Sequence, residues 1–168
     1  MKPSDNIALI GMPGVGKSTV GVLLAKATGR GFVDTDVLIQ AREGRTLQQI
    51  IAAAGMPAFL LLEEGHITSL ELTAHVIATG GSAVYSAAAM THLAAGGVIV
   101  YLHLPCELLE RRIANLATRG VVIAPGHTFR DLYDQRAGLY HRRADLTVDC
   151  QDKNQDEITS EIVRRLGT

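Results

Sequence analysis

The sequence contains no tryptophan, and aromatic residues make up only 4% of its 168 residues. Its core must therefore be built mainly from Ala, Val, Leu and Ile. Only two cysteines are present, Cys106 and Cys150, and their spacing is not that of a metal site. We expect two reduced thiols and a cytoplasmic protein. The formal net charge is −1, which argues against binding to nucleic acid by bulk electrostatics.

Targeting and membrane signals are also missing. The N-terminal segment passes directly into an apolar run and a glycine-rich loop, which leaves no room for a signal-peptide core. No apolar run approaches the ~20 residues of a membrane span, so we expect no membrane partner. The length and the balance of hydrophobic and charged residues favour one globular domain over residues 1–168. We expect a monomer that binds a small molecule.

Short apolar runs alternate with segments of helical periodicity along the whole chain. This order predicts an α/β fold with a parallel five-stranded sheet and helices on both faces, and ligands then bind beyond the carboxyl ends of the strands. Thr35 is a possible N-cap, and Thr46 with Gln49 forms a capping-box pattern. The predicted strands are 6–11, 31–34, 75–81, 96–104 and 144–149. The predicted helices are 16–29, 35–43, 46–55, 57–72, 105–120, 129–143 and 156–166.

Residues 11–19 read GMPGVGKST and match the pattern G-x-x-x-x-G-K-[ST] without a mismatch. The segment follows a predicted strand and opens a predicted helix, which is the context that this phosphate-binding loop requires. Its glycines let successive N–H groups point at phosphate oxygens, and the helix adds the positive end of its dipole. We therefore predict a purine nucleoside triphosphate, with Lys17 on its phosphates and Ser18 on Mg²⁺.

Two aspartates, Asp34 and Asp36, stand at the end of the second predicted strand. Buried carboxylates need compensation, and a Mg²⁺–triphosphate beside them would compensate one. The other could accept a hydrogen bond from an acceptor hydroxyl and take its proton. The alternative interpretation is a pair of acids at a helix N-terminus, which helix starts favour in any case.

The segments GMPGVGKST, FVDTD, ATGGSAV and QRAGLYHRRADLTVD resemble the shikimate kinase family, in order and with similar spacing over nearly the whole chain. The resemblance implies the P-loop, nucleoside-monophosphate-kinase-like fold and ATP-dependent phosphoryl transfer to a hydroxyl of shikimate or a shikimate-like polyol. It also implies a place in aromatic amino acid biosynthesis.

The resemblance implies roles for individual residues. Lys17, Asp34 and Asp36 would be catalytic, and Ser18 with Asp34 would hold the metal. The implied ATP-binding residues are Gly11, Gly14, Val15, Gly16, Lys17, Ser18, Thr19 and Arg119. The implied acceptor-binding residues are Asp36, Gly80, Gly81, Arg136 and Glu63. Arg119 would belong to a lid over about 117–128, and Arg136 would pair with the acceptor carboxylate.

Three positions depart from the family pattern. Leu60 stands where the family carries a second arginine for the acceptor carboxylate, and we expect it on the wall opposite Arg136. Ser82 takes the third place of the glycine triplet, and Ala78 stands where a serine is common. The run AFLLL (58–62) is otherwise interpreted as core packing. The ATP end thus matches the family, whereas the acceptor end does not.

Other functions stay open. The loss of an arginine at position 60 favours an acceptor that needs less charge compensation, such as a cyclitol or gluconate. A different class of function is a nucleotide-binding regulator that has lost phosphoryl transfer. The retention of Lys17, Ser18, Asp34 and Asp36 together argues against such a regulator.

Overall fold

The computed structural model describes residues 2, 4–114 and 126–167. Within them, five parallel strands form one sheet in the order β2-β3-β1-β4-β5. The predicted parallel five-stranded sheet is confirmed. The strands are β1 (Asn6–Ile10), β2 (Gly31–Asp34), β3 (His75–Ala78), β4 (Gly97–His103) and β5 (Leu146–Asp149). Because β1 lies between β3 and β4, it is buried along its whole length.

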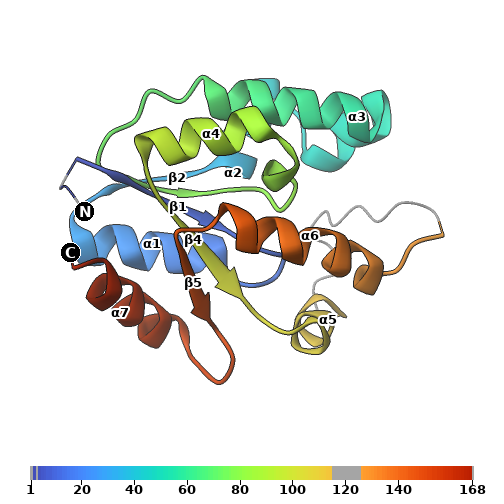
Figure 1. Cartoon of the computed structure of the whole chain (residues 1–168). Coiled ribbons are helices and arrows are strands. Elements are labelled where there is room, and N and C mark those ends of the chain that lie inside the picture. Colours follow the sequence, from blue (N-terminus) through green and yellow to red (C-terminus); the bar gives the residue numbers. More distant parts are fainter. Residues whose placement is uncertain (1, 3, 115–125, 168) are drawn as a thin grey trace.

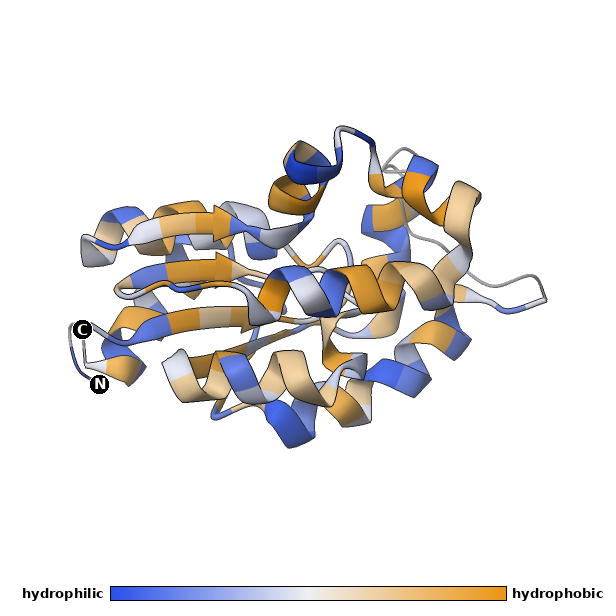
Figure 2. Cartoon of the chain, turned by 90° about the horizontal axis from the view of Figure 1, so that it is seen from above, coloured by the Kyte–Doolittle hydropathy of each residue, from blue (hydrophilic) through white to orange (hydrophobic). Residues whose placement is uncertain are grey.

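Helices cover both faces of the sheet. Helix α1 packs on β3 and beside α7, and α3 packs beside α4, which contacts β1 and β4 (Figure 1). In Figure 2 the apolar colour follows the strands in the middle, between helices that carry polar stretches. The helices are α1 (Lys17–Thr28), α2 (Thr35–Glu43), α3 (Leu47–Thr68), α4 (Ala87–Gly96), α5 (Cys106–Ala114), α6 (Phe129–Arg143) and α7 (Gln155–Leu166), with a 3₁₀ turn η1 (Ala83–Tyr85).

Helix α3 combines two segments that the sequence analysis separates. The backbone at Gly55 is not helical (φ 81°, ψ 165°), so the helix is kinked there, just before Pro57. The predicted capping box at its start is present, because the Thr46 side chain accepts from the N–H of Gln49 and the Gln49 side chain accepts from the N–H of Thr46. The helix ends at Thr68, four residues earlier than predicted.

One helix among the described residues, α3, is long and apolar enough to cross a membrane by length and composition alone. This helix has 22 residues, and its most apolar 18-residue window reaches a mean hydropathy of 1.3. The alanines and leucines on either side of Gly55 produce this value, although no long unbroken apolar run exists. In the structure α3 packs on α2, α4 and η1.

Two further predictions need correction. The segment 82–95 carries no predicted element, yet it forms η1 and α4, which Ser86 caps by accepting from the N–H of Ala89. This helix is alanine-rich and lacks a clear polar face, so its periodicity is weak. The N-cap of α2 is Asp34 rather than Thr35.

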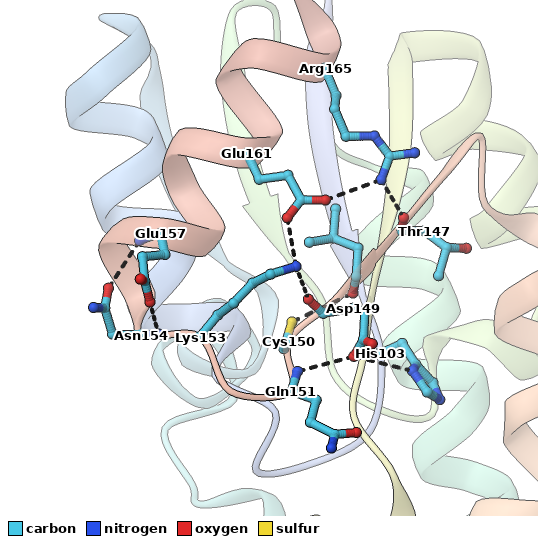
Figure 3. Close-up of polar contacts among 11 residues, drawn as sticks. His103, Thr147, Asp149, Cys150, Gln151, Lys153, Asn154, Glu157, Glu161 and Arg165 are labelled. Carbon is cyan, nitrogen blue, oxygen red and sulfur yellow. Dashed lines mark hydrogen bonds and ion pairs between the residues drawn. The ribbon is translucent and has the colours of Figure 1, made fainter.

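The loop between β5 and α7 is held by several polar contacts at the carboxyl end of the sheet (Figure 3). Lys153 Nζ donates to Asp149 O at 2.8 Å and to Glu161 Oε2 at 2.7 Å. Asn154 and Glu157 form a capping box at the start of α7. The loop is therefore fixed from both of its neighbouring elements.

Candidate active site

The glycine-rich loop between β1 and α1 has the backbone that a phosphate cradle needs. Gly11, Gly14 and Gly16 all have positive φ, at 144°, 83° and 107°. A Cβ on Gly11 would lie 2.6 Å from the carbonyl oxygen of Leu102, so only glycine fits between this loop and the end of β4. The loop leads directly into α1, and its N–H groups gather at the positive end of that helix.

Lys17 begins α1, and its ammonium turns back over the loop. Its Nζ donates to the carbonyl oxygens of Gly11 at 2.7 Å and Met12 at 3.0 Å. Only 9% of the residue is exposed. Burial lowers the pKa of Lys17 to about 8, and the nearby carboxylate of Asp36 opposes this shift. The ammonium is thus held over the loop without a direct carboxylate partner among the described residues.

Asp34 joins the phosphate loop to α2. Its Oδ2 accepts from Ser18 Oγ at 2.6 Å. Its Oδ1 accepts from the N–H groups of Asp36 and Val37 at 3.0 and 3.2 Å and so caps α2. The N-cap interpretation is confirmed for Asp34, whereas its role at a metal stays a prediction; the oxygen that faces Ser18 is the one that such a role would use. Two hard oxygens side by side suit Mg²⁺.

Asp36 lies in the first turn of α2 and is half-buried. Its pKa is raised, first by burial and then by the neighbouring carboxylate of Asp34, while Lys17 lowers it. The side chain lines a cavity of about 220 Å³ together with the phosphate loop. A carboxylate with a raised pKa at such a place is a candidate proton acceptor.

The same cavity gathers most of the residues predicted for the acceptor end. Gly80 and Gly81, after β3, and Arg136, from α6, line it together with Lys17, Ser18 and Asp36. Gly80 N donates to Thr35 Oγ1 at 3.1 Å, and Gly81 O accepts from Tyr140 Oη at 2.7 Å. The glycine pair is thereby fixed between α2 and α6.

Glu63, from α3, does not line this cavity but a neighbouring hollow; its Oε1 lies close to Gly80, and the residue is only 1% exposed. Its Oε2 accepts from Ser82 Oγ at 2.6 Å, whereas its Oε1 has no hydrogen-bond partner in the described part of the chain. Burial raises the pKa of Glu63 to about 7, and the Ser82 hydrogen bond opposes the shift. Ser82, which departs from the family pattern, thus has a defined partner.

Arg136 is 6% exposed and does not meet a carboxylate within the described residues. Its Nε donates to Tyr85 Oη at 3.1 Å, and its guanidinium carbon lies 5.0 Å from the centre of the Tyr85 ring. The arginine is held in place by an aromatic partner and keeps its charge for an anion.

The expected position of Leu60 needs correction. It does not line the cavity that contains Asp36 and Arg136 but a neighbouring apolar hollow with Leu61 and Tyr85. Ser82 lines both spaces. The cause is the direction of α3, which presents Phe59 to the cavity and turns Leu60 away from it. The AFLLL run is also only partly core, because Phe59 is 4% exposed and Leu61 is 71% exposed.

Two predictions fall on residues for which the structure gives no description. Arg119 and positions 117–125 of the predicted lid over 117–128 lie outside the described residues. They remain predictions from the sequence.

Several contributors were not found from the sequence. Thr35 and Tyr140 fix the glycine pair, and Tyr85 fixes Arg136. Thr79 donates to the carbonyl oxygen of Leu9 at 3.0 Å and ties β3 to β1. These partners are far apart in the sequence, so only the fold reveals them. Thr79 and Tyr85 lie close to Gly80 and Gly81 in the sequence, whereas Thr35 and Tyr140 carried no such signal.

Comparison with known proteins identifies the family. The model of the family described as shikimate kinase matches residues 13–167. The chain belongs to the shikimate kinase family. A shikimate kinase from Mycobacterium avium is 39% identical over 162 residues, covering 94% of this chain and 91% of that protein. One from Thiobacillus denitrificans is 41% identical over 152 residues, covering 89% and 83%.

A solved structure agrees with the sequence comparison. The shikimate kinase from Acinetobacter baumannii in complex with shikimate matches with a TM-score of 0.87 at 33% identity, covering 97% of this chain and 93% of that one. The predicted resemblance and the P-loop kinase fold are confirmed. The chain is an ATP-dependent phosphotransferase with an alcohol group as acceptor, and its cofactors are ATP and Mg²⁺.

Proposed function

We propose that the chain transfers the γ-phosphoryl group of ATP to a hydroxyl of shikimate or of a shikimate-like polyol. The observation that carries this proposal is the single cavity that joins the phosphate loop, Asp36 and Arg136. A nucleotide-binding regulator has no need for a carboxylate and a buried arginine at the far end of its nucleotide site.

The phosphate loop and Lys17 bind the triphosphate of ATP. The loop N–H groups hold the phosphates, and the ammonium of Lys17 exchanges its two carbonyl partners for phosphate oxygens. Its charge then meets the negative charge that develops on the transferred group, so it contributes more in the transition state than in the ground state.

Ser18 and Asp34 fit the metal. Their oxygens are 2.6 Å apart, and both are the hard ligands that Mg²⁺ prefers. Bound there, the metal would neutralise charge on the triphosphate. Asp34 keeps its other oxygen on the N–H groups of α2, which fixes its orientation.

Asp36 acts on the hydroxyl of the acceptor. Its carboxylate accepts a hydrogen bond from the reacting hydroxyl and receives the proton as the new O–P bond forms and the bond to ADP breaks. Gly80 and Gly81 allow the acceptor to approach the backbone, and Arg136 offers its charge to an acceptor carboxylate. Glu63 supports the site from behind, because it accepts from Ser82, which lines the cavity.

The acceptor screen tests the proposal. ADP formation is measured with shikimate, quinate, gluconate and cyclitols, each with ATP and Mg²⁺. We expect turnover that depends on an acceptor, and we expect it for a cyclic polyol such as shikimate. ADP formation that no acceptor changes would reject the kinase and support the regulator.

The shikimate-bound relative supports a small molecule as the partner. We propose that the protein acts in the cytoplasm as a monomer and meets neither nucleic acid nor a membrane. The formal net charge of −1 supports the part of this proposal that concerns nucleic acid.

A further inference from the structure

We propose that Tyr85 is a positioning residue for the acceptor site: it fixes the guanidinium of Arg136 so that the Nη1–Nη2 edge faces a carboxylate of the acceptor. This inference rests on the proposed function and refines it, because it names the residue that orients the cation offered to an acceptor acid. Tyr85 does not line the cavity that contains Arg136, so it acts through the arginine and not on the acceptor itself.

The first support is that the two ends of the guanidinium have different surroundings. At one end, Nε donates to Tyr85 Oη at 3.1 Å. At the other end, Nη1 lies over Gly81, because a Cβ added there would be 3.0 Å from Nη1 and 2.9 Å from Pro13 Cδ. Both Gly81 and Pro13 line the cavity. The terminal nitrogen therefore reaches the cavity beside the phosphate loop, whereas Nε is held by Tyr85.

The second support is the shape of the arginine side chain. A guanidinium is a planar fork with five N–H donors, and either its Nε–Nη2 edge or its Nη1–Nη2 edge can meet both oxygens of a carboxylate. The bond to Tyr85 occupies Nε, so the Nη1–Nη2 edge remains for a two-point contact. Tyr140 also lies near the guanidinium, and its hydroxyl donates to Gly81 O at 2.7 Å.

The third support is the anchoring of the segment that carries Tyr85. Tyr85 ends η1, which follows the glycine pair after one residue, and its N–H donates to Ser82 O at 2.9 Å. Ser82 Oγ in turn donates to the buried Glu63, and the two residues between Ser82 and Tyr85 are buried. One short segment therefore carries both the glycines that the acceptor approaches and the hydroxyl that holds Arg136, which fixes them relative to each other.

The ring and the hydroxyl of Tyr85 contribute separately. The guanidinium carbon of Arg136 lies 5.0 Å from the centre of the ring, within cation–π distance, so phenylalanine would keep this contact and lose the bond to Nε. Tyr85 is 40% exposed, so its substitution removes little core packing. It borders the hollow beside Leu60, and position 60 offers no cation that could replace a guanidinium that has turned.

Calorimetry with a non-hydrolysable ATP analogue and Mg²⁺ tests the inference without turnover. The ligands are shikimate and its methyl ester, which lacks the negative charge that Arg136 would meet. We expect the wild type to prefer shikimate and Tyr85→Phe to lower this preference about five- to tenfold, because a guanidinium free to turn must be ordered on binding. The affinity for the ester should stay unchanged. Tyr85→Leu, which also loses the ring, should lower the preference further.

Tyr133→Phe is the matched control, because it removes the same atom from another tyrosine. Tyr133 lies on α6, the helix of Arg136, but its hydroxyl is 3.2 Å from His103 Nε2 and the residue does not line the cavity. This variant should keep the preference of the wild type. The ratio of the two affinities is the informative quantity, since a general disturbance of the fold would weaken both ligands.

Nitrogen-15 NMR of the arginine Nε–H groups gives a second readout in the protein without an acceptor. Arg136→Lys identifies the signal of Arg136, because that signal is missing from its spectrum. The bond to Tyr85 should slow the exchange of this hydrogen with water, and Tyr85→Phe should speed the exchange about tenfold. Equal exchange in both proteins would contradict the inference.

A preference for shikimate that Tyr85→Phe keeps or raises would also overturn the inference, because Arg136 would then bind the carboxylate without Tyr85. Equal affinities of the wild type for shikimate and its ester would overturn it as well, since Arg136 would then meet no carboxylate. ADP formation that no acceptor changes would instead reject the proposed kinase, and the calorimetric comparison does not depend on that assay.

Discussion

Glu63 holds a proton more tightly in the folded chain than in the unfolded one. Burial raises its pKa from 4.5 to about 7, so the native state binds the proton between these two values while the unfolded state has lost it. Stability therefore falls as the pH rises from about 4.5 to 7. The free energy of unfolding should decrease by up to about 3 kcal/mol over this range through this residue.

Denaturant unfolding of the wild type and of Glu63→Gln at pH 5 and pH 8 measures the effect. Glutamine cannot ionise but can still accept from Ser82, so the wild type should lose more stability than the variant on going to pH 8. Parallel changes in both proteins would show that Glu63 is ionised throughout and would remove this part of the account.

Leu60 stands where the family carries a second arginine, so Arg136 is the one cation from these two positions for an acceptor carboxylate. Shikimate should bind weakly to the wild type, since a buried carboxylate with half its partners costs about 2–5 kcal/mol, or roughly tens- to thousands-fold in affinity. Position 60 faces the neighbouring hollow, but Leu60→Arg introduces a longer, cationic side chain three residues before Glu63, and Ser82 borders both the hollow and the cavity. We expect shikimate affinity to rise at least about tenfold.

Leu61→Arg provides the control for this prediction. Leu61 borders the same hollow as Leu60 but is 71% exposed, so an arginine there adds the same charge with its guanidinium in the solvent. Calorimetry of shikimate with both variants, each saturated with an ATP analogue, compares them. Tight binding by the wild type would contradict the prediction, because another residue would then be supplying the charge.

At the scale of elements, α2 depends on Asp34 for its first turn as well as for its place beside Ser18. Asp34→Ala removes the cap and should destabilise the protein by about 1 kcal/mol. Asp34→Asn keeps a capping oxygen but loses the charge near the metal, so its stability should stay close to that of the wild type. Its turnover should need more Mg²⁺.

Thermal unfolding and Mg²⁺ titration of turnover separate these two roles. The expected pattern is a stability loss in Asp34→Ala only and a weaker Mg²⁺ response in both variants. An unchanged Mg²⁺ dependence in Asp34→Asn would leave Asp34 as a capping residue alone.

The helices and strands also show which sequence signals are enough for a correct structural prediction. β1 and the phosphate loop were predictable because a short apolar run and three glycines leave few alternatives. The capping box at Thr46 is local and was correctly read. The kink at Gly55 was not predicted, because two helical patterns separated by a glycine fit both a break and a bend. The predicted position of Leu60 was wrong for a different reason. The surroundings of a helical residue depend on how the whole helix packs, which the local sequence does not show.

At the scale of the whole molecule, the order of strands brings distant segments to one edge of the sheet. β1, β2 and β3 are adjacent, so the phosphate loop, the aspartate pair and the glycine pair meet there, as the βα alternation predicts. The bond between Arg136 and Tyr85, and the unpartnered oxygen of Glu63, depend on tertiary contacts over long sequence distances. Sequence patterns could not supply them.

The identity of the phosphorylated product tests the central claim most directly. Phosphorus NMR follows ATP, Mg²⁺ and shikimate with the wild type and with Lys17→Ala, whose fold is checked by circular dichroism. The account predicts a phosphomonoester that forms in step with ADP in the wild type and does not form with the folded variant. ADP that accumulates without a phosphomonoester, or a phosphomonoester formed equally by Lys17→Ala, would contradict it.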